Sequence, residues 1–437
     1  MKLKYIRLAF AAFAVTVCAA SANADVWTLD SCINYAHNNN ITVKQRKINA
    51  QNAELDITAA KDRFLPTAQA YASQSFDFGR GLTSENTYAN RNTKSFGWGA
   101  DVSLPLFQGL AGVRRLDYAK AGLLTALEQI EAATDDLTLN IIAQYLQVLY
   151  SKEVSKIAAD QAHLSQIELE RRRELLEAGK IPELDLLQAE SQLAADRLSA
   201  VNAQNDVTLA LTDLASLLQI PYFPGFDVDS VADDEAMLPS VDDVFSNALA
   251  NNHSIRAANY DTESARKNVR LAQTGYIPTL SLSAGLGSNW YSVSGFDNTN
   301  FGKQMRDNFA KRIGFTLAVP IFDAFNTRNQ VRRAQAAVVT AELQADDTRT
   351  RLYNNIQQAY VRATAARQKY QSGLVAERAA RAAFDAMTQK YNFGRANATE
   401  YEQTKSAWFR TRGELVQSRY ESILRARILN FYNRTNP

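Results

Sequence analysis

Cysteine, histidine and long apolar runs are all scarce in this chain of 437 residues. It has two cysteines, Cys18 and Cys32, and three histidines, His37, His163 and His253. No histidine lies at metal-ligand spacing from another histidine or from Cys32, which argues against a metal site. The sequence also lacks a phosphate-binding loop and a nucleophile elbow. These absences argue against an enzyme, and neither a metal nor another cofactor is expected.

The start of the chain, residues 1–24, has the pattern of a secretory signal peptide. A basic start is followed by an apolar run over 8–20 and by an Ala-x-Ala cleavage site at 22–24. Lipid attachment at Cys18 is the weaker alternative. Removal of the segment leaves Cys32 as the single cysteine, so no disulfide can form within the chain and packing must hold the fold.

Neither sign of charge dominates. The 48 Lys and Arg side chains nearly balance 46 Asp and Glu side chains, and removal of residues 1–24 takes away three basic residues, which gives a net charge of −1. A nucleic-acid-binding protein would carry a concentrated basic excess, so the charge balance argues against that class. Beyond the signal segment no apolar run reaches about 18 residues, and no transmembrane helix is expected.

The sequence does contain an internal duplication of one large unit. The motif Phe-Leu-Pro-Thr at 64–67 recurs 212 residues later as Tyr-Ile-Pro-Thr at 276–279, and Leu-Pro-Leu-Phe at 104–107 recurs after 215 residues as Val-Pro-Ile-Phe at 319–322. A period this long indicates two copies of a large folding unit rather than a solenoid. The strand-end prolines of the two copies are Pro66, Pro105, Pro278 and Pro320.

The duplication divides the mature chain into three parts. The first repeat covers 25–219 and the second covers 240–437. Between them, 220–239 is rich in proline and acidic residues and is expected to be a linker that forms a belt midway along a rod of helices.

Each repeat contains two segments in which apolar residues alternate with Ser, Gly, Thr and Asp. Strands are therefore predicted at 67–78, 95–107, 279–291 and 311–322. A strand half-buried on a soluble core remains the alternative, but the polar face and a length of about ten residues favour membrane strands. Residues 79–94 and 291–310, rich in Gly, Asn, Ser and Thr, are predicted to be exposed loops.

Each strand pair is followed by a very long helix and a shorter return helix. The long helices are predicted at 110–177 and 326–392, with return helices at 182–219 and 397–432. A rise of 1.5 Å per residue makes each long helix roughly 100 Å. Their apolar positions have coiled-coil-like spacing, so antiparallel packing is expected.

Four membrane strands cannot close a barrel, because an open sheet edge in lipid leaves backbone groups unpaired. Other copies of the chain must complete the sheet. A dimer would give eight strands and a trimer twelve, and the residues alone do not choose between them.

The ordered set of motifs resembles the TolC family of outer membrane efflux proteins over essentially the whole mature chain. The motifs that carry the resemblance include the glycine-containing breaks at 173–185 and 390–400. The resemblance implies a mainly α fold with a β-barrel portion: a homotrimer with a twelve-stranded outer membrane barrel that continues as a long periplasmic α-barrel. It also implies an exit duct for small molecules or proteins, served by a periplasmic adaptor protein and an inner-membrane RND or ABC pump, with no catalysis.

The resemblance places the functional residues at the two breaks. It implies that the adaptor contacts the turns, at Gly179, Lys180, Ile181, Gly394, Arg395 and Ala396. Each glycine also suits a simple helix C-cap, and the two interpretations can hold together.

The same resemblance implies a latch that closes the tunnel. A hydrogen bond from Tyr391 to Asp185 would hold it, although Asp185 also suits the first turn of a helix. A second latch arginine of the family is not matched, because Ala396 stands at its position and Arg395 lies one residue earlier. Glu400 matches an acidic ring in the pore, with an exposed helix surface as the alternative.

A secreted coiled-coil adhesin is the alternative function. It would also be exported and helical. It does not explain four barrel-type strands that recur in pairs.

Overall fold

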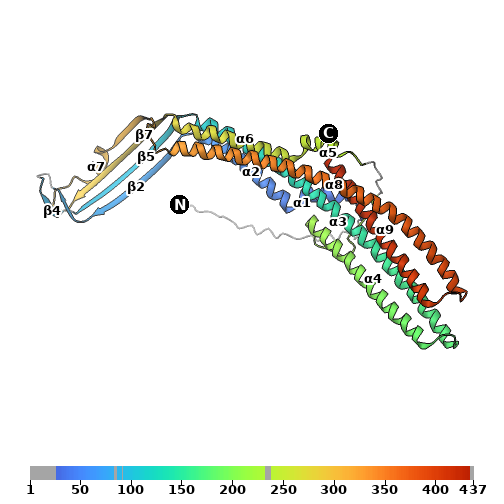
Figure 1. Cartoon of the computed structure of the whole chain (residues 1–437). Helices are drawn as coiled ribbons and strands as arrows, with labels where there is room; N and C mark the ends of the chain where they lie inside the picture. Colours follow the sequence, from blue (N-terminus) through green and yellow to red (C-terminus); the bar gives the residue numbers. More distant parts are fainter. Residues whose placement is uncertain (1–25, 83–85, 91, 232–237, 434–437) are drawn as a thin grey trace. The chain divides into compact units, whose positions relative to one another are not determined.

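A computed structural model describes residues 26–82, 86–90, 92–231 and 238–433, so the expected signal peptide lies outside the described residues. The chain divides into two compact units, each built from three separate segments (Figure 1). The first unit takes its described residues from Met1–Asn40, Leu137–Met237 and Ala363–Arg427. The second takes them from Ile41–Asp136, Leu238–Arg362 and Ile428–Pro437.

The first unit is helical. It contains α1 (Leu29–Asn39), α4 (Glu183–Leu218), most of α9 (Ala398–Tyr432) and parts of the long helices α3 (Ala111–Glu177) and α8 (Asn326–Asn392). The bounds of α3, α4, α8 and α9 lie within one residue of the ranges that the sequence predicts. The regularly spaced apolar residues of α3 form the buried stripe, and they include Leu137, Ile141, Tyr145 and Val148.

The linker contributes a short strand to the first unit. Within 220–239, β6 (Asp227–Val228) pairs in parallel with β1 (Val26–Trp27). The Tyr145 hydroxyl lies 2.9 Å from the Trp27 carbonyl and 2.8 Å from the Asp229 carbonyl. Burial raises the pKa of this hydroxyl, so it stays a neutral donor. The linker is therefore fastened to α3, which composition alone does not reveal.

The helices of the second unit include α2 (Ile41–Asp62), α5 (Val241–Asn251), α6 (His253–Gln273) and the remaining parts of α3 and α8. Glu128 of α3 binds two side chains of α6, since it lies 2.8 Å from His253 Nδ1 and accepts from Arg256 Nη2 at 2.6 Å. The side chain of Asn252 caps α6 by accepting from the Ile255 amide. No helix in the described residues is both long and apolar enough to cross a membrane.

The second unit also holds a sheet in the antiparallel order β2-β5-β7-β8. Its strands are β2 (Thr67–Asp77), β5 (Thr93–Gln108), β7 (Thr279–Val293) and β8 (Ala310–Ala318). β5 of the first repeat pairs with β7 of the second from Thr93↔Val293 to Gln108↔Thr279. The two hairpins therefore form one continuous sheet, and its outer strands are β2 and β8.

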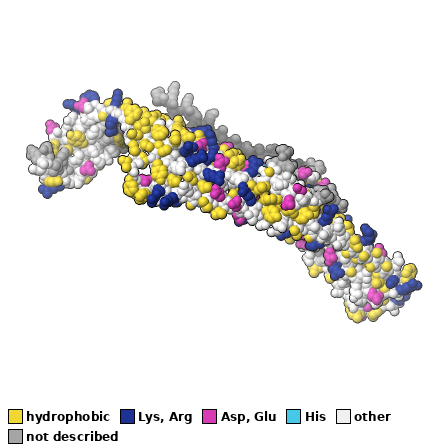
Figure 2. All heavy atoms as spheres, turned by 45° about the horizontal axis from the view of Figure 1, so that its top comes forward, with side chains coloured by type: hydrophobic (Ala, Val, Ile, Leu, Met, Phe, Trp, Pro, Cys, Tyr) yellow, Lys and Arg dark blue, Asp and Glu magenta, His cyan; other side chains and the backbone are white. Residues whose placement is uncertain are grey.

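The two faces of the sheet differ as the alternation predicts. The pairs Val102↔Ala284, Leu104↔Leu282 and Leu282↔Phe315 lie on one face, and Asp101↔Gly285 lies on the other. Figure 2 shows hydrophobic side chains gathered where the strands give way to the helices, and Lys and Arg side chains at the loop end of the sheet.

The last strand is shorter than predicted. β8 ends at Ala318 rather than at residue 322, and Pro320 lies beyond it because proline has no N–H to donate to a neighbouring strand. The chain then turns through positive φ angles of 54° at Ala324 and 63° at Phe325. Pro105 lies inside β5, where the register with β7 shifts, whereas Pro66 and Pro278 directly precede β2 and β7.

The two predicted loops at the end of the sheet carry secondary structure. The first contains the small pair β3 (Arg80–Leu82) and β4 (Tyr88–Asn90). In the second, β7 continues to Val293 and a helix, α7 (Phe301–Asp307), follows, so only part of 291–310 is without secondary structure. The helix escaped prediction because its seven residues are too few to show a period of 3.6.

Candidate functional site

The breaks after the two long helices have the same backbone geometry. Gly179 and Gly394 each have φ = +67°, a left-handed conformation that favours glycine. In the first turn the Lys180 amide donates to the Leu175 carbonyl at 2.9 Å, and in the second the Arg395 amide donates to the Lys390 carbonyl at 2.8 Å. Both turns are Schellman caps, so the C-cap interpretation of the glycines is correct.

The return helices begin differently. α4 begins after Pro182, which makes no side-chain cap. α9 begins with a capping box: the Glu400 amide donates to Asn397 Oδ1 at 2.8 Å, and the Asn397 amide donates to Glu400 Oε2 at 3.2 Å. The Glu400 carboxylate therefore has a structural role, and its place in an acidic ring stays a prediction.

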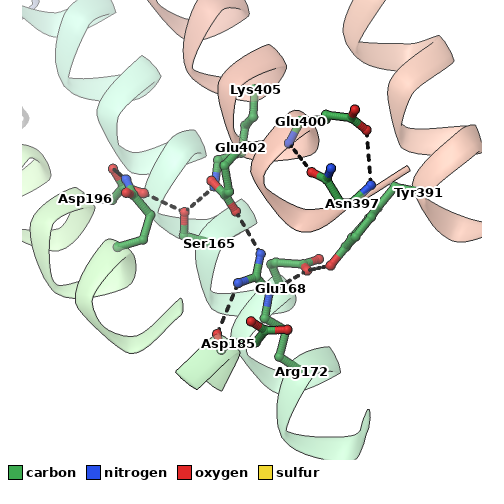
Figure 3. Close-up of polar contacts among 11 residues, drawn as sticks. Ser165, Glu168, Arg172, Asp185, Asp196, Tyr391, Asn397, Glu400, Glu402 and Lys405 are labelled. Carbon is green, nitrogen blue, oxygen red and sulfur yellow. Dashed lines mark hydrogen bonds and ion pairs between the residues drawn. The ribbon is translucent and has the colours of Figure 1, made fainter. Parts of the chain in front are cut away.

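Tyr391 makes no hydrogen bond to Asp185 among the described residues, and the predicted latch between the two stays a prediction. The Tyr391 hydroxyl donates to Glu168 Oε1 of α3 at 2.5 Å, whereas Asp185 of α4 offers only its main-chain carbonyl, which accepts from Arg172 at 3.2 Å (Figure 3). Glu168 takes this place because it lies on the buried stripe of α3. Burial and the bond to Glu168 raise the pKa of Tyr391 to about 12, so the hydroxyl remains a donor at neutral pH.

Arg172 holds the acceptor carboxylate in place. Its Nε donates to Glu168 Oε1 at 3.0 Å, and its Nη2 lies 3.6 Å from Glu402 Oε1 of α9, an ion-pair distance too long for a hydrogen bond. Burial alone would lower the pKa of Arg172, but the hydrogen bond and charge of Glu168 outweigh it and the pKa is raised. Arg172 therefore stays charged inside the helical bundle.

A buried lysine continues the network. Lys405 of α9 is fully buried, lies 2.7 Å from Glu402 Oε2 and donates to Ser165 Oγ at 2.9 Å. Ser165 in turn donates to Asp196 Oδ2 of α4 at 2.5 Å. The carboxylate of Asp196 also accepts from two glutamine side chains, those of Gln161 and Gln192.

The network joins all four helices of the two hairpins. It contains three carboxylates, two cations, one hydroxyl and one phenol: Asp196, Glu168, Glu402, Lys405, Arg172, Ser165 and Tyr391. Removal of one member of a buried ion pair costs about 3–5 kcal/mol, because the partner charge is left without compensation. The hairpin ends are thus held together by contacts that depend on charge rather than by apolar packing alone.

The other predicted residues form the turns themselves. Lys180 and Arg395 are exposed, while Ile181 and Ala396 are half-buried. Within the described residues the Arg395 guanidinium makes no hydrogen bond or ion pair, so its latch role stays a prediction. Tyr391 also stacks on Tyr401, with ring centroids 4.7 Å apart.

Sequence reasoning missed most of the network. A signal is present, because the polar residues Ser151, Ser165 and Arg172 are separated by multiples of seven residues and all are buried. Polar residues on the core stripe of a coiled coil mark places where neighbouring helices must supply partners. Within the described residues there is no cluster of His, Cys, Asp and Glu that could hold a metal ion.

The comparison with known proteins decides the family. The sequence profile of the outer membrane efflux protein family matches residues 32–218 and again 244–428. The chain belongs to this family. The double match also covers both repeats separately. Members of the family are transport channels rather than enzymes.

Individual relatives agree with the family match. Outer membrane protein TolC of Escherichia coli (strain K12) is 23% identical over 363 residues, which cover 79% of this chain and 72% of the relative. Outer membrane efflux protein BepC of Brucella suis is 21% identical over 400 residues, or 91% of this chain and 83% of the relative. The solved CmeC outer membrane channel of Campylobacter jejuni has the same fold, with a TM-score of 0.77 at 18% identity over 93% of this chain and 85% of that chain.

These matches fix the location and the general role. This outer membrane efflux protein lies in the outer membrane and extends into the periplasm. It is an exit duct of an efflux or type I secretion system. The family match therefore favours the duct over the coiled-coil adhesin.

Proposed function

We propose that three copies of this chain form the duct, with β8 of each copy beside β2 of the next. The observation that carries the proposal is the four-stranded sheet with one apolar face, one polar face and two outer strands that have no neighbour on their outer sides among the described residues. Each unpaired backbone group in lipid costs several kcal/mol, so both edges must be covered. Three copies give twelve strands and a lumen.

The polar face of the sheet suits the wall of this lumen. It carries Ser, Gly and Thr, and at two places a large side chain fills the space over a glycine. The Tyr71 ring lies over Gly99, and Asp101 lies over Gly285. A Cβ on either glycine would come within 3.0 Å of these side chains. The inner surface thus alternates small and large polar residues, as the interiors of barrels do.

The proposed gate lies at the hairpin ends of the first unit. The network around Glu168, Arg172 and Lys405 fastens the four helices within one chain, and opening requires these charge-dependent contacts to rearrange. In this proposal Asp185 and Arg395 remain free to contact the neighbouring copy, and Glu400 faces the passage.

The turns are the proposed docking place for a periplasmic adaptor protein, which links the duct to an inner-membrane RND or ABC pump. A Cβ added at Gly179 or at Gly394 would meet no neighbouring atom within 4 Å, so the turns project freely. Phe393, in the second turn, is 78% exposed and offers an apolar contact. The pump supplies the energy, and the chain itself needs no catalytic residue.

Reconstitution tests the duct. The purified chain is expected to migrate as a compact trimer on an unboiled gel and as a monomer after boiling. In a planar bilayer the same sample is expected to produce discrete single-channel conductance steps. A stable trimer that never conducts, in the wild-type chain and in a Glu168→Gln variant, would favour a surface protein over a channel.

A further inference from the structure

The short helix α7 lies on the apolar side of the sheet, at the loop end. Phe301 at its start lies against Phe96 and Trp290, with ring centroids 5.9 and 5.5 Å apart. Ser288 Oγ donates to the Met305 carbonyl at 2.6 Å. Phe96, Ser288 and Trp290 share the face of the sheet that carries Leu104 and Leu282.

Side-chain amides fix the segment around α7 to the exposed edge of β7. Beyond Gly287, β7 has no pairing with β8. There Gln304 bonds both the amide and the carbonyl of Tyr291, at 3.1 and 2.9 Å, and Asn298 bonds both groups of Val293 at 2.8 Å. These amides replace a missing strand, so α7 is held in one position on the sheet rather than left as a free loop.

Four cations lie on this helix or on the strands near it. Lys303 and Arg306 lie on α7, Lys94 lies on β5 two residues from Phe96, and Lys311 on β8 is paired with Leu286. All four are exposed, and Arg306 is 77% exposed; among the residues that the structure describes, its ion pair is with its neighbour Asp307, at 3.7 Å. In the described part of the chain Lys94 and Lys303 make no ion pair.

The depth of these cations in the membrane can be inferred from the aromatic rings beside them. Phe309 stacks on Trp98, and Lys311 Nζ lies 5.8 Å from the Phe309 ring. Toward the helices the same face becomes aliphatic, with Leu282 and Leu286 on β7. Aromatic residues gather where the hydrocarbon of a membrane meets its headgroups, so the cations lie at headgroup level on the loop side.

We propose that α7 and its four cations form a binding surface for phosphate-bearing lipid headgroups of the outer leaflet. Positive charge beside an aromatic belt complements an anionic headgroup whose acyl chains lie along the aliphatic face. The backbone that carries these cations is held in place, so binding requires little loss of conformational entropy. The surface would orient the duct in the bilayer by a contact that is separate from transport.

Tryptophan quenching tests the proposal, because Trp98 and Trp290 lie beside the surface. The full-length trimer is reconstituted in brominated phosphatidylcholine, which quenches both side chains, while Trp27 and Trp408 lie in the other unit and give a constant background. Addition of lipid A with two phosphates is expected to restore emission by displacing the brominated lipid. Each cation removed is expected to raise the lipid A concentration needed for half-maximal displacement about fivefold. The double variant Lys303→Gln with Arg306→Gln should therefore raise it about 25-fold.

The neighbouring Arg312 provides the matched control, because it pairs with Gly285 on the opposite, polar face. Arg312→Gln is expected to leave displacement unchanged. If α7 variants do not assemble as trimers on unboiled gels, Lys94→Gln on the regular strand β5 replaces them. Equal displacement by dephosphorylated lipid A, or an equal effect of Arg312→Gln, would overturn the proposal. Blockage of displacement by millimolar inorganic phosphate would also overturn it, since the site would then bind soluble anions.

Discussion

The two hairpin turns have the same backbone and different side chains around it. Gly179 and Gly394 share φ = +67° and the same pair of capping hydrogen bonds. At the 215-residue offset of the repeat, however, Glu168 corresponds to Ala383 and Arg172 to Met387. The duplication thus preserved the turn and changed the chemistry on the helices that lead into it.

On the return helices the change is in the opposite direction, because there the second repeat carries network residues that the first repeat lacks. Glu402 and Lys405 belong to the second repeat, and their counterparts in the first are Leu187 and Glu190. Tyr391 likewise corresponds to Leu176. The network therefore takes its long-helix charges from one repeat and its return-helix cation from the other, and it occurs once per chain. Neither repeat alone supplies all of it.

Loss of the buried lysine should distinguish the two repeats most strongly. Lys405→Met leaves Glu402 without its close cation and Ser165 without its donor, so we expect a loss of about 3–5 kcal/mol in the free energy of unfolding. Denaturant melts followed by circular dichroism measure it. The matched change at the exposed counterpart, Glu190→Gln, should stay within about 0.5 kcal/mol. Similar losses at both positions would mean that the repeats are energetically equivalent.

Removal of the acceptor should open the proposed gate. Glu168→Gln weakens the charge-assisted bonds from Tyr391 and Arg172, and we expect a loss of about 1–3 kcal/mol together with a raised single-channel conductance. Asp185→Asn keeps the main-chain carbonyl that Arg172 uses and should leave the intrachain network intact. A larger rise in conductance for Asp185→Asn than for Glu168→Gln would support the pairing of Tyr391 with Asp185 that the sequence predicts.

Substitution of the two glycines should show what the repeats still share. Gly179→Ala and Gly394→Ala each place a Cβ in a left-handed conformation, with no neighbouring atom within 4 Å to add a clash. We expect nearly equal losses of about 1–2 kcal/mol, measured by the same melts. A difference larger than about 1 kcal/mol would show that one turn depends on contacts beyond its own backbone.

The smallest change in stability is expected at Glu400. Glutamine also serves in a capping box, so Glu400→Gln should alter the free energy of unfolding by less than about 0.5 kcal/mol. If Glu400 faces the passage, the same change should lower the preference for cations, measured as a reversal potential in a salt gradient. An unchanged reversal potential would leave Glu400 with the capping role alone.

Features that depend on local pattern could be predicted from the sequence. Alternation located the strands, and the glycine breaks located the turns, because both signals lie within a few consecutive residues. The pairing of β5 with β7 could not be predicted, since the partners lie far apart in the chain and no residue type specifies the choice.

The hydrogen bond from Tyr391 to Glu168 could not be predicted for a related reason. Asp185 and Glu168 are both acids near the same turn, and the choice between them depends on which faces of α3 and α8 are in contact. The end of β8 was placed too late, because the alternation continues through Val319 and Ile321 after pairing has stopped. Apolar residues in an exposed turn have the same pattern as residues in a strand.

The composition of the two compact units has a consequence for synthesis. Each unit draws on three separate stretches, and the last stretch of the first unit begins only at Ala363. A chain that stops after the first repeat would hold only part of either unit, with its apolar stripes uncovered. Neither unit can therefore be finished before almost the whole chain has been made, so no complete unit of this chain can fold while the rest is still being synthesised.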